Sequence, residues 1–461
     1  MKILHYMFGI PPVRGGGLVI YALDLINAQK NNGDEVILLI PGSINRKKRN
    51  ATKILKGTRK NIGIEHYIIK NALPIPLASG IKDTEWFTAM GDYKIYNEFL
   101  QKLKPDIIHV HSLMGVHANF FIAAKELRIP MVYTTHDYFG LCPTLMLFKG
   151  QCNCEVMDWN ECWECCRNAY TKTQLILEQS ELYYWYRQQH CLINLKDRLI
   201  GFASVFRKTR PDKKPNHDVD VEKRDCTTEY SDLKKYYQLI FREITFFHYN
   251  SSIAKEQYEK FLPNVRGKVV SITNTAVEDH RKTINFGHTL RIGYLGRIEE
   301  SKGYYFLQEA INNVYVSGRV NIELNIYTKE KRAWPCFVRV NVPYKYSEIV
   351  EVMKNLDVVV VPSLWRETFG FTALEAISCG VPVIVTDFVG AKDLLKNKNW
   401  GYLIKADKIE LQRLIEHIYD DRGLLRDINT SICNDVFDIS MENHRKEMKL
   451  LYDLAESCIK G

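Results

Sequence analysis

Two glutamates and a glycine form the most specific chemical pattern in the sequence, within the stretch PSLWRETFGFTALEAISCGVPVIVTD. Glu367 follows a strand predicted at Val358–Val361. Gly370 opens a predicted helix, and Glu375 lies in its early turns. A helix N-terminus is positive and presents free amides to a phosphate, and a carboxylate on either side could hold sugar hydroxyls. The pattern therefore predicts a site for a ligand that combines phosphate and sugar.

A second group of charges follows the strand predicted at Leu290–Leu295, in GYLGRIEESKG. Gly296 permits close approach of a ligand to the backbone. Arg297 and Lys302 supply two cations at a strand end, which suits a phosphate-rich ligand. Each cation alone would equally fit a solvated charged turn.

A glycine run, Gly15-Gly16-Gly17, follows the first predicted strand, Lys2–Phe8. Backbone amides of such a loop, placed at a helix N-terminus, can approach an anionic group closely. A tight strand–helix turn would use the same residues, so the run alone leaves both interpretations open.

Two histidines end predicted strands of the first half. His136, next to Asp137, follows the strand predicted at Met131–Thr134, and His111 ends another strand. A histidine at the carboxyl end of a strand faces the cleft and can donate or accept a hydrogen bond near neutral pH. We interpret His136 as a site residue and His111 as a structural polar residue.

Apolar strands alternate with helical patterns along both halves of the chain, which predicts parallel sheets covered by helices. The predicted fold class is α/β, with two Rossmann-like, doubly wound domains facing each other across a cleft. Ligands of such sheets bind beyond the carboxyl ends of the strands. Further strands are predicted at Glu35–Ile40, Ile107–Val110, Thr245–Tyr249, Lys268–Ile272, Glu323–Tyr327 and Val381–Val385.

The expected domains are residues 1–280, with a cysteine-rich, partly helical insertion at about 142–242, and residues 281–440. An amphipathic helix at 441–461 is expected to pack back on the first domain. A length of 461 residues exceeds that of an ordinary single domain. The net charge of +9 suits an anionic partner, but no nucleic-acid motif accompanies the basic residues.

Six of the twelve cysteines lie between Cys142 and Cys166. Cys162 and Cys165 have the two-residue spacing common in zinc sites. The candidate ligands of a structural zinc are Cys142, Cys152, Cys162 and Cys165, with Cys154 as the alternative. A set of reduced, buried cysteines explains the cluster equally well.

Together these stretches resemble the retaining glycosyltransferases of family 4, which have the GT-B fold. The glycine loop, DIIHVHS, TTHD, GYLGRIEESKG and ETFGFTALE with its following GVPVIVTD carry the resemblance, which covers the chain except for the insertion. It implies an enzyme that moves a sugar from a nucleotide-sugar donor, held mainly by the second domain, to an acceptor held mainly by the first. We expect a UDP-sugar rather than a GDP-sugar, and no cofactor required for catalysis.

The resemblance also implies roles for individual residues. Arg297 and Lys302 would hold the donor diphosphate, Glu367 would contact the transferred sugar, and Glu375 would bind the ribose. His136 would face the transferred sugar. The implied catalytic residues are Glu367, His136, Arg297 and Lys302. The implied donor-binding residues are Gly16, Gly17, Gly296, Arg297, Lys302, Glu367, Thr368, Phe369, Gly370, Phe371 and Glu375.

Two stretches depart from the family pattern. Thr328-Lys329-Glu330 stands where the family often has Gly-x-Gly, which puts contacts to the base and acceptor in doubt. Asp218-Val-Asp220 resembles a metal-binding DxD motif but lies in a charged loop. The alternatives are an inactive GT-B partner subunit of a glycosyltransferase complex and a sugar-nucleotide epimerase of similar fold.

The resemblance suggests surface-polysaccharide biosynthesis (capsule, exopolysaccharide or lipopolysaccharide) with a glycan or lipid-linked acceptor. No run has the length of a membrane span, and the first residues do not resemble a secretion signal, so we expect a cytoplasmic protein. Weak peripheral contact with the inner leaflet is expected from the basic segment Arg46–Lys60. The aromatic stretch Tyr183–Tyr186 suits a headgroup region, but we interpret it as core of the insertion.

Overall fold

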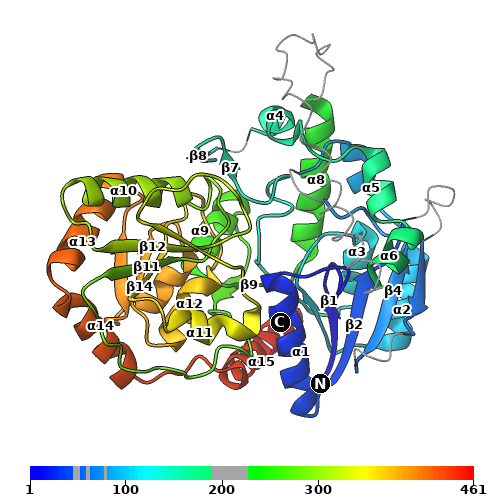
Figure 1. Ribbon diagram of the computed structural model, residues 1–461. Helices are drawn as coiled ribbons and strands as arrows, with labels where there is room; N and C mark the ends of the chain where they lie inside the picture. The colour runs from blue at the N-terminus through cyan, green and yellow to red at the C-terminus, as the bar shows by residue number, and fades with distance from the viewer. Residues whose placement is uncertain (45–51, 59–62, 77–79, 157, 189–226, 461) are drawn as a thin grey trace, which may run out of the picture.

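The computed structural model describes residues 1–44, 52–58, 63–76, 80–156, 158–188 and 227–460. Figure 1 shows two α/β domains side by side, each built around its own sheet. The predicted fold class is confirmed, because both sheets are mainly parallel and helices cover them.

The N-terminal sheet has the strand order β10-β9-β6-β5-β1-β2-β4-β3, and only the edge strand β3 runs antiparallel to its neighbour. The central strands are apolar and buried, as expected for strands covered on both faces. The strands are β1 Lys2–Tyr6, β2 Glu35–Pro41, β3 Lys53–Lys56, β4 Glu65–Lys70, β5 Ile107–Val110, β6 Met131–Thr134, β9 Phe246–Tyr249 and β10 Gly267–Val269.

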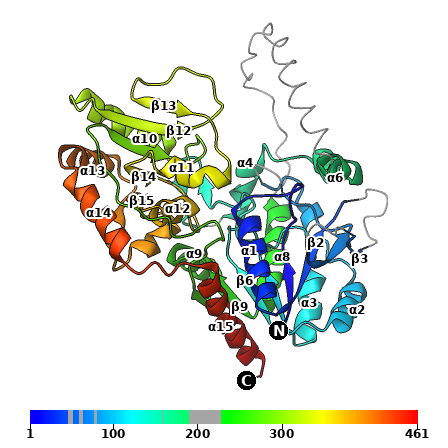
Figure 2. The ribbon, with the colours of Figure 1, turned by 60° about the horizontal axis from the view of Figure 1, so that its bottom comes forward.

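Helices cover both faces of this sheet. One face packs against α2 (Tyr93–Leu103), α3 (Ala118–Glu126) and α8 (Thr227–Glu243). The other face packs against α1 (Gly17–Asn31) and α15 (Met441–Lys460), through buried residues such as Leu25, Met448 and Leu451. The last helix of the chain therefore belongs to the core of the first domain, and Figure 2 shows it beside α1 and β9.

The C-terminal sheet is entirely parallel, with the strand order β13-β12-β11-β14-β15-β16. Its strands are β11 Leu290–Tyr294, β12 Ile322–Tyr327, β13 Val338–Asn341, β14 Val358–Val361, β15 Val383–Thr386 and β16 Gly401–Ile404. Two apolar clusters bury its faces. The covering helices are α10 Tyr304–Val316, α11 Ile349–Met353, α12 Phe371–Ser378, α13 Lys408–Asp420 and α14 Gly423–Asn434, and α9 (Ser252–Phe261) lies between β9 and β10 in the chain.

The insertion after β6 is partly helical, as predicted. It begins with a short hairpin, β7 (Phe148–Lys149) and β8 (Cys152–Asn153), and continues through α4 (Cys162–Cys166), α5 (Lys172–Glu178) and α6 (Glu181–Gln188). Asn153 reaches the second domain, where its amide donates to the Leu364 carbonyl at 2.9 Å. The hairpin therefore braces the loop that leads to Glu367.

One secondary expectation needs correction, and another lies partly outside the described residues. The described part of the basic segment Arg46–Lys60 contains the edge strand β3, while Arg46, Lys47, Lys48 and Arg49 lie outside the described residues. The aromatic stretch Tyr183–Tyr186 lies in α6 but is not core, because Trp185 is 54% exposed. Asp218 and Asp220 also lie outside the described residues. In the part of the chain that the structure describes, no helix is long and apolar enough to cross a membrane.

Candidate active site

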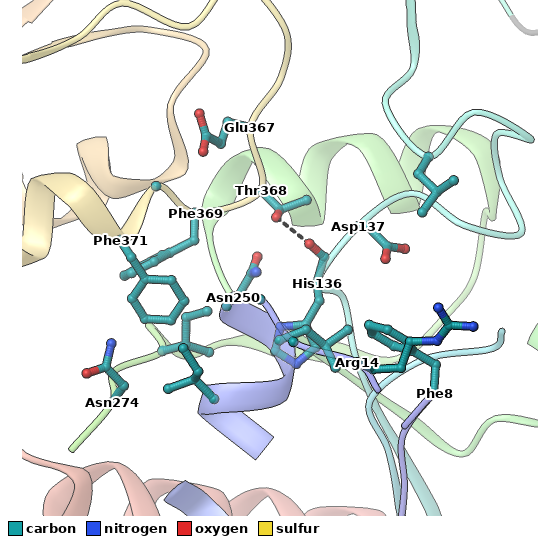
Figure 3. A pocket seen from close by; sticks show the side chains of 18 of the residues that line it. Phe8, Arg14, His136, Asp137, Asn250, Asn274, Glu367, Thr368, Phe369 and Phe371 are labelled. Atoms are coloured by element: carbon teal, nitrogen blue, oxygen red, sulfur yellow. Dashed lines mark hydrogen bonds between the residues drawn. The ribbon is translucent and has the colours of Figure 1, made fainter. Parts of the chain in front are cut away.

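A cavity of about 690 Å³ lies at the carboxyl ends of the strands, with walls from both domains. In Figure 3, Glu367, Phe369 and Phe371 approach it from the C-terminal domain, and Arg14, His136 and Asp137 from the N-terminal domain. This is the position in which open parallel sheets bind ligands.

The glycine loop forms one wall of this cavity. Gly15, Gly16 and Gly17 line it, and Gly16 has a φ of 108°, which favours glycine. A Cβ at Gly17 would lie 3.4 Å from the ring of Phe371 across the cavity. The loop leaves open the space that a ligand would need.

Glu367 is held by two donors. Lys302 Nζ donates to Glu367 Oε1 at 2.8 Å, and Ser363 Oγ donates to Oε2 at 2.5 Å. Burial would raise the pKa of Glu367, but the charge and hydrogen bond of Lys302, aided by Ser363, hold that pKa below its ordinary value. Glu367 is therefore a carboxylate at neutral pH, with its orientation fixed beside the cavity.

The N-terminus of α12 opens on the cavity next to Glu367. Its first residue follows Gly370, which has a φ of 98° and lies where a Cβ would come within 2.8 Å of Val389. Phe371 and Thr372 line the cavity, and the first turn carries no acidic residue and no side-chain cap. These amides are available to an anionic group.

Glu375 lies one turn further along α12, at the end of a short chain of hydrogen bonds. Asn274 Nδ2 donates to the Tyr346 hydroxyl at 2.9 Å, and Tyr346 donates to Glu375 Oε1 at 2.8 Å. Burial raises the pKa of Glu375, and the Tyr346 hydroxyl partly offsets this. Glu375 lines the cavity, and its Oε2 has no hydrogen-bond partner among the described residues.

His136 and Asp137 line the opposite wall. Burial lowers the pKa of His136 well below its ordinary value, and His248 and His444 add to this, so the ring is neutral at pH 7. Burial raises the pKa of Asp137 to about 6. Its Oδ1 accepts from the amide of Phe139 at 2.8 Å. Thr368 Oγ1 donates to the His136 carbonyl at 2.7 Å, which joins the two walls directly (Figure 3).

The two predicted diphosphate cations differ in their surroundings. Lys302 is 20% exposed, pairs with Glu367 and lies 5.1 Å from the ring centroid of Trp365. Arg297 is 71% exposed and pairs with Glu299 at 3.1 Å, although its charge also lowers the pKa of Glu367. Neither cation nor Gly296 lines the cavity, and Lys302 approaches it through its ion pair with Glu367. The two cations thus differ in exposure and in partner, and their contact with the donor diphosphate stays a prediction.

Several cavity residues were not among the predicted site residues. Arg14 lines the cavity, and its Nε and Nη2 are buried without a hydrogen-bond partner in the part of the chain that the structure describes. Asp137 follows His136 directly and could have been found from that neighbour. Trp365 lies two residues before Glu367 in the stretch PSLWRETFG and could have been found there. Asn274 and Tyr346 carry no local signal, because only the fold brings them to the cavity.

The cysteine cluster lies outside this cavity, beside the β7–β8 hairpin. Burial raises the pKa of Cys154 to about 11, and neighbouring Cys142 and Cys165 add to this. The pKa of Cys162 is raised by burial and by its neighbours, which include Cys142 and Cys154. Cys152 is exposed. The thiols that influence one another's pKa values are those of Cys142, Cys154, Cys162 and Cys165, and the predicted zinc ligands stay a prediction.

Comparisons with known proteins point in one direction. Residues 289–421 match the family described as glycosyl transferases group 1, and residues 15–153 match glycosyltransferase family 4. The capsular polysaccharide biosynthesis glycosyltransferase CapM of Staphylococcus aureus is 31% identical over 180 residues, which cover 36% of this chain and 44% of CapM. An uncharacterized 42.6 kDa protein from the cps region of Klebsiella pneumoniae is 22% identical over 307 residues, which cover 65% and 62% of the two chains.

Solved structures share the arrangement of both domains. Sucrose-phosphate synthase from Thermosynechococcus elongatus superposes with a TM-score of 0.54 and 14% identity, over 98% of this chain and 99% of that one. HepE of Anabaena, in complex with UDP and glucose, superposes with a TM-score of 0.51 and 12% identity, over 99% of each chain. At such identities the likeness shows the fold alone. The matches to three curated relatives span only 27%, 44% and 62% of their lengths.

Proposed function

We propose that this chain, which belongs to the family 4 glycosyltransferases and has the GT-B fold, transfers a sugar from a nucleotide-sugar donor to an acceptor glycan. The observation that carries the proposal is the Glu367 carboxylate, fixed by Lys302 and Ser363 beside the free N-terminus of α12. Both features border one cavity between the two domains.

The chemistry follows from these charges. Cleavage of a sugar–diphosphate bond places negative charge on the leaving phosphate, which helix amides and Lys302 would stabilise without reorganisation. Glu367 would hold the sugar hydroxyls, and Glu375 with its free oxygen would bind the ribose. The carboxylates that line the cavity among the described residues are Asp137, Glu367 and Glu375. We assign none of them as a nucleophile, so retention of configuration would proceed by attack on the same face.

The donor proposed is a UDP-sugar. HepE, with the same fold, has been solved with UDP and glucose, and its two domains correspond to those described above. The proposal is consistent with a site in which Glu375, Tyr346 and Asn274 present polar groups to a nucleoside.

The acceptor proposed carries an anionic group, as a diphosphate-linked lipid does. Arg14 supports this, because its Nε and Nη2 are buried without a partner among the described residues, and buried atoms of a cation are costly until an anion pairs with them. CapM is named for capsular polysaccharide biosynthesis. A Campylobacter jejuni relative is named for transfer to a diphospho-undecaprenol acceptor. We therefore place the reaction in polysaccharide biosynthesis. The basic segment Arg46–Lys60 would make weak, peripheral contact with the inner leaflet.

A thermal-shift panel of UDP-, GDP- and ADP-sugars tests the function. A donor present at a hundredfold excess over its Kd stabilises the folded state by about 2.7 kcal/mol, and we expect only UDP-sugars to do so. Sugar release or transfer with that donor then separates a transferase from an inactive partner subunit. Interconversion of the donor without an acceptor would instead identify an epimerase, and a flat panel would reject nucleotide-sugar binding.

The cysteine cluster is proposed as a structural zinc site with Cys142, Cys154, Cys162 and Cys165 as ligands. The four thiols lie near one another in the same part of the insertion and are free of disulfides. In the described residues, however, no three of their sulfur atoms lie within 4.8 Å of one another, so binding would draw them together. The raised pKa values mean that zinc must displace protons.

We expect about one zinc per chain in protein purified without a metal-affinity resin. Cys154→Ser should lose the metal and lower the unfolding temperature, whereas Cys152→Ser, two residues away and exposed, should keep both. Elemental analysis and thermal unfolding measure these outcomes. Metal-free wild-type protein, or equal loss in the two variants, would leave a set of reduced cysteines as the explanation.

A further inference from the structure

A row of buried histidines lies on the face of the N-terminal sheet that α1 and α15 cover. His5 on β1 and His109 on β5 are register partners, His111 follows β5, and His248 lies on β9. All four side chains are buried. His111 also lies 5.8 Å from His136, measured between ring centroids, and His136 lines the cavity.

One continuous chain of hydrogen bonds connects these residues with both covering helices. Gln29 comes from α1 and Tyr452 from α15. The successive distances are His111 Nε2–His5 Nδ1 3.0 Å, His5 Nε2–Gln29 Oε1 2.8 Å, Gln29 Nε2–Tyr452 OH 2.8 Å, Tyr452 OH–His109 Nδ1 2.8 Å, His109 Nε2–Thr134 Oγ1 2.7 Å, Thr134 Oγ1–His248 Nδ1 2.8 Å and His248 Nε2–Val270 O 2.8 Å.

Each ring in the chain is neutral at pH 7. Burial lowers the pKa of His5 to about 3 and that of His248 to about 4. Burial also lowers the pKa values of His109 and His111 well below their ordinary range. A neutral imidazole has one N–H and one bare nitrogen. The direction of each hydrogen bond in the chain therefore determines the direction of the next one.

The Val270 carbonyl sets the direction, because a carbonyl can only accept. His248 Nε2 must donate to it, so His248 Nδ1 accepts from the Thr134 hydroxyl. Since the Thr134 proton is then used, His109 Nε2 must donate to Thr134. His109 Nδ1 is therefore bare and accepts from Tyr452.

The same logic fixes the other half of the chain. The Tyr452 proton is used on His109, so the amide nitrogen of Gln29 must donate to Tyr452 and its oxygen faces His5. His5 Nε2 donates to that oxygen, and His5 Nδ1 accepts from His111 Nε2. His111 Nδ1 is left as a bare lone pair, and it has no partner among the described residues.

His136 supplies the complementary group. Its Nε2 is also buried and lacks a partner in the described part of the chain. Leaving both His111 Nδ1 and His136 Nε2 buried without a hydrogen bond costs free energy. A small ring rotation or one bridging water would join them, with Nε2 of His136 as the donor.

We propose that this one-directional chain fixes the tautomer of His136, with Nε2–H pointing inward and a bare Nδ1 left toward the cavity as a permanent hydrogen-bond acceptor. Tyr452, on the last helix of the chain, is the positioning residue at its centre. The consequence for catalysis rests on the proposed function, since the acceptor would receive a hydroxyl of the transferred sugar. The tautomer itself does not depend on that function.

Three of these histidines, His5, His109 and His111, also have ligand atoms within 4.8 Å of one another. A metal ion there would have to break the chain, because both ring nitrogens of His5 and of His109 already have partners. Zinc binding at this cluster is therefore an alternative that the experiment must exclude.

Selective ¹⁵N labelling of histidine, with two-bond ¹H–¹⁵N correlation spectra of the free full-length protein at pH 7, reads each tautomer directly. His5, His109, His111, His136 and His248 are all expected as neutral Nε2–H forms. A Nδ1–H or charged His111 or His136 overturns the proposal. So does a shift of these signals to a metal-bound pattern on addition of zinc.

Tyr452→Phe tests whether the chain acts as a unit, because it removes one hydroxyl that both accepts and donates. The signals of His5, His111 and His136, which lie beyond Tyr452, are expected to become mixtures of tautomers, whereas His109 and His248 should keep theirs because Val270 and Thr134 still fix them. Tyr96→Phe is the matched control. It removes another buried tyrosine hydroxyl, bonded to His117 Nδ1 at 2.7 Å, but on the opposite face of the sheet and outside the chain. Unchanged tautomers in Tyr452→Phe, or equal changes in both variants, overturn the proposal.

Substitution of Thr134 interrupts the hydrogen-bond chain at a second point and can be used if Tyr452→Phe does not fold. Thr134→Val should turn the fixed histidine tautomers into mixtures. Thr134→Ser, which keeps the hydroxyl, should show the same single tautomers as the wild type. With the donor found in the panel, Thr134→Val should lower kcat roughly tenfold and leave KM unchanged. An equal loss in Thr134→Ser, or a change confined to KM, contradicts a positioning role. The spectra of the free protein remain decisive even if no donor is found.

Discussion

Glu367→Gln is expected to remove most sugar transfer while the protein stays folded. Glutamine has the shape of glutamate and can still accept from Lys302, so the local packing is retained. The negative charge beside the transferred sugar is lost. By analogy with removal of one preorganised group, turnover should fall about 10²–10³-fold. Initial rates with the donor from the panel, with thermal unfolding as the check on folding, measure this.

Glu309→Gln is the matched control for this substitution. Glu309 is exposed in the middle of α10, pairs with Lys408 and does not line the cavity, so the same chemical change should leave turnover unaltered. Donor affinity is measured separately by titration. Near-normal turnover of Glu367→Gln would show that this carboxylate does not touch the reacting sugar.

The sequence was sufficient for the fold because its strands are short, apolar and bounded by turns. Val358–Val361 and Met131–Thr134 were placed at their observed limits. Four strands of the two large sheets were missed, namely β3, β4, β13 and β16. Each is partly exposed, and β3, β4 and β13 carry charged residues, so these three lack the continuous apolar pattern of a central strand.

The sequence was less informative about the surroundings of each site residue. Arg297 and Lys302 look alike in GYLGRIEESKG, yet one is 71% exposed and the other 20%. The difference comes from Glu367, which lies 65 residues from Lys302 in the chain. Such long-range pairing leaves no local pattern.

The hydrogen-bond chain of histidines also depends on residues that are distant in the sequence. His111 was interpreted as structural, and the structure does bury it. Its role depends on Tyr452, which lies 343 residues from His109 and 423 from Gln29. Similarly, Cys152 and Cys154 have equivalent spacing to the other cysteines, and only the hairpin distinguishes the exposed one.

Lys302→Ala is expected to cost about 2.7–4 kcal/mol of transition-state stabilisation, which is 10²–10³-fold in turnover. The ammonium is partly buried between Glu367 and Trp365, where its charge is weakly screened. Arg297→Ala removes a cation from the same loop that is exposed and paired with Glu299, so its effect should be smaller. Equal effects of the two substitutions would show that burial does not decide which cation acts on the diphosphate.

The same substitution should shift the pH dependence of turnover, because Glu367 loses the cation that keeps it ionised. Burial, which raises the pKa of Glu367, is then opposed only by Ser363 and the more distant Arg297. The acid limb of the pH–rate profile should therefore move to higher pH. In the wild type the lowered pKa adds stability above the ordinary value of 4.5, and this is lost as the pH falls through the folded-state value. In Lys302→Ala that gain should disappear, so its unfolding temperature should fall most, relative to wild type, at neutral pH. An acid limb that stays in place would mean that Lys302 does not control the charge of Glu367.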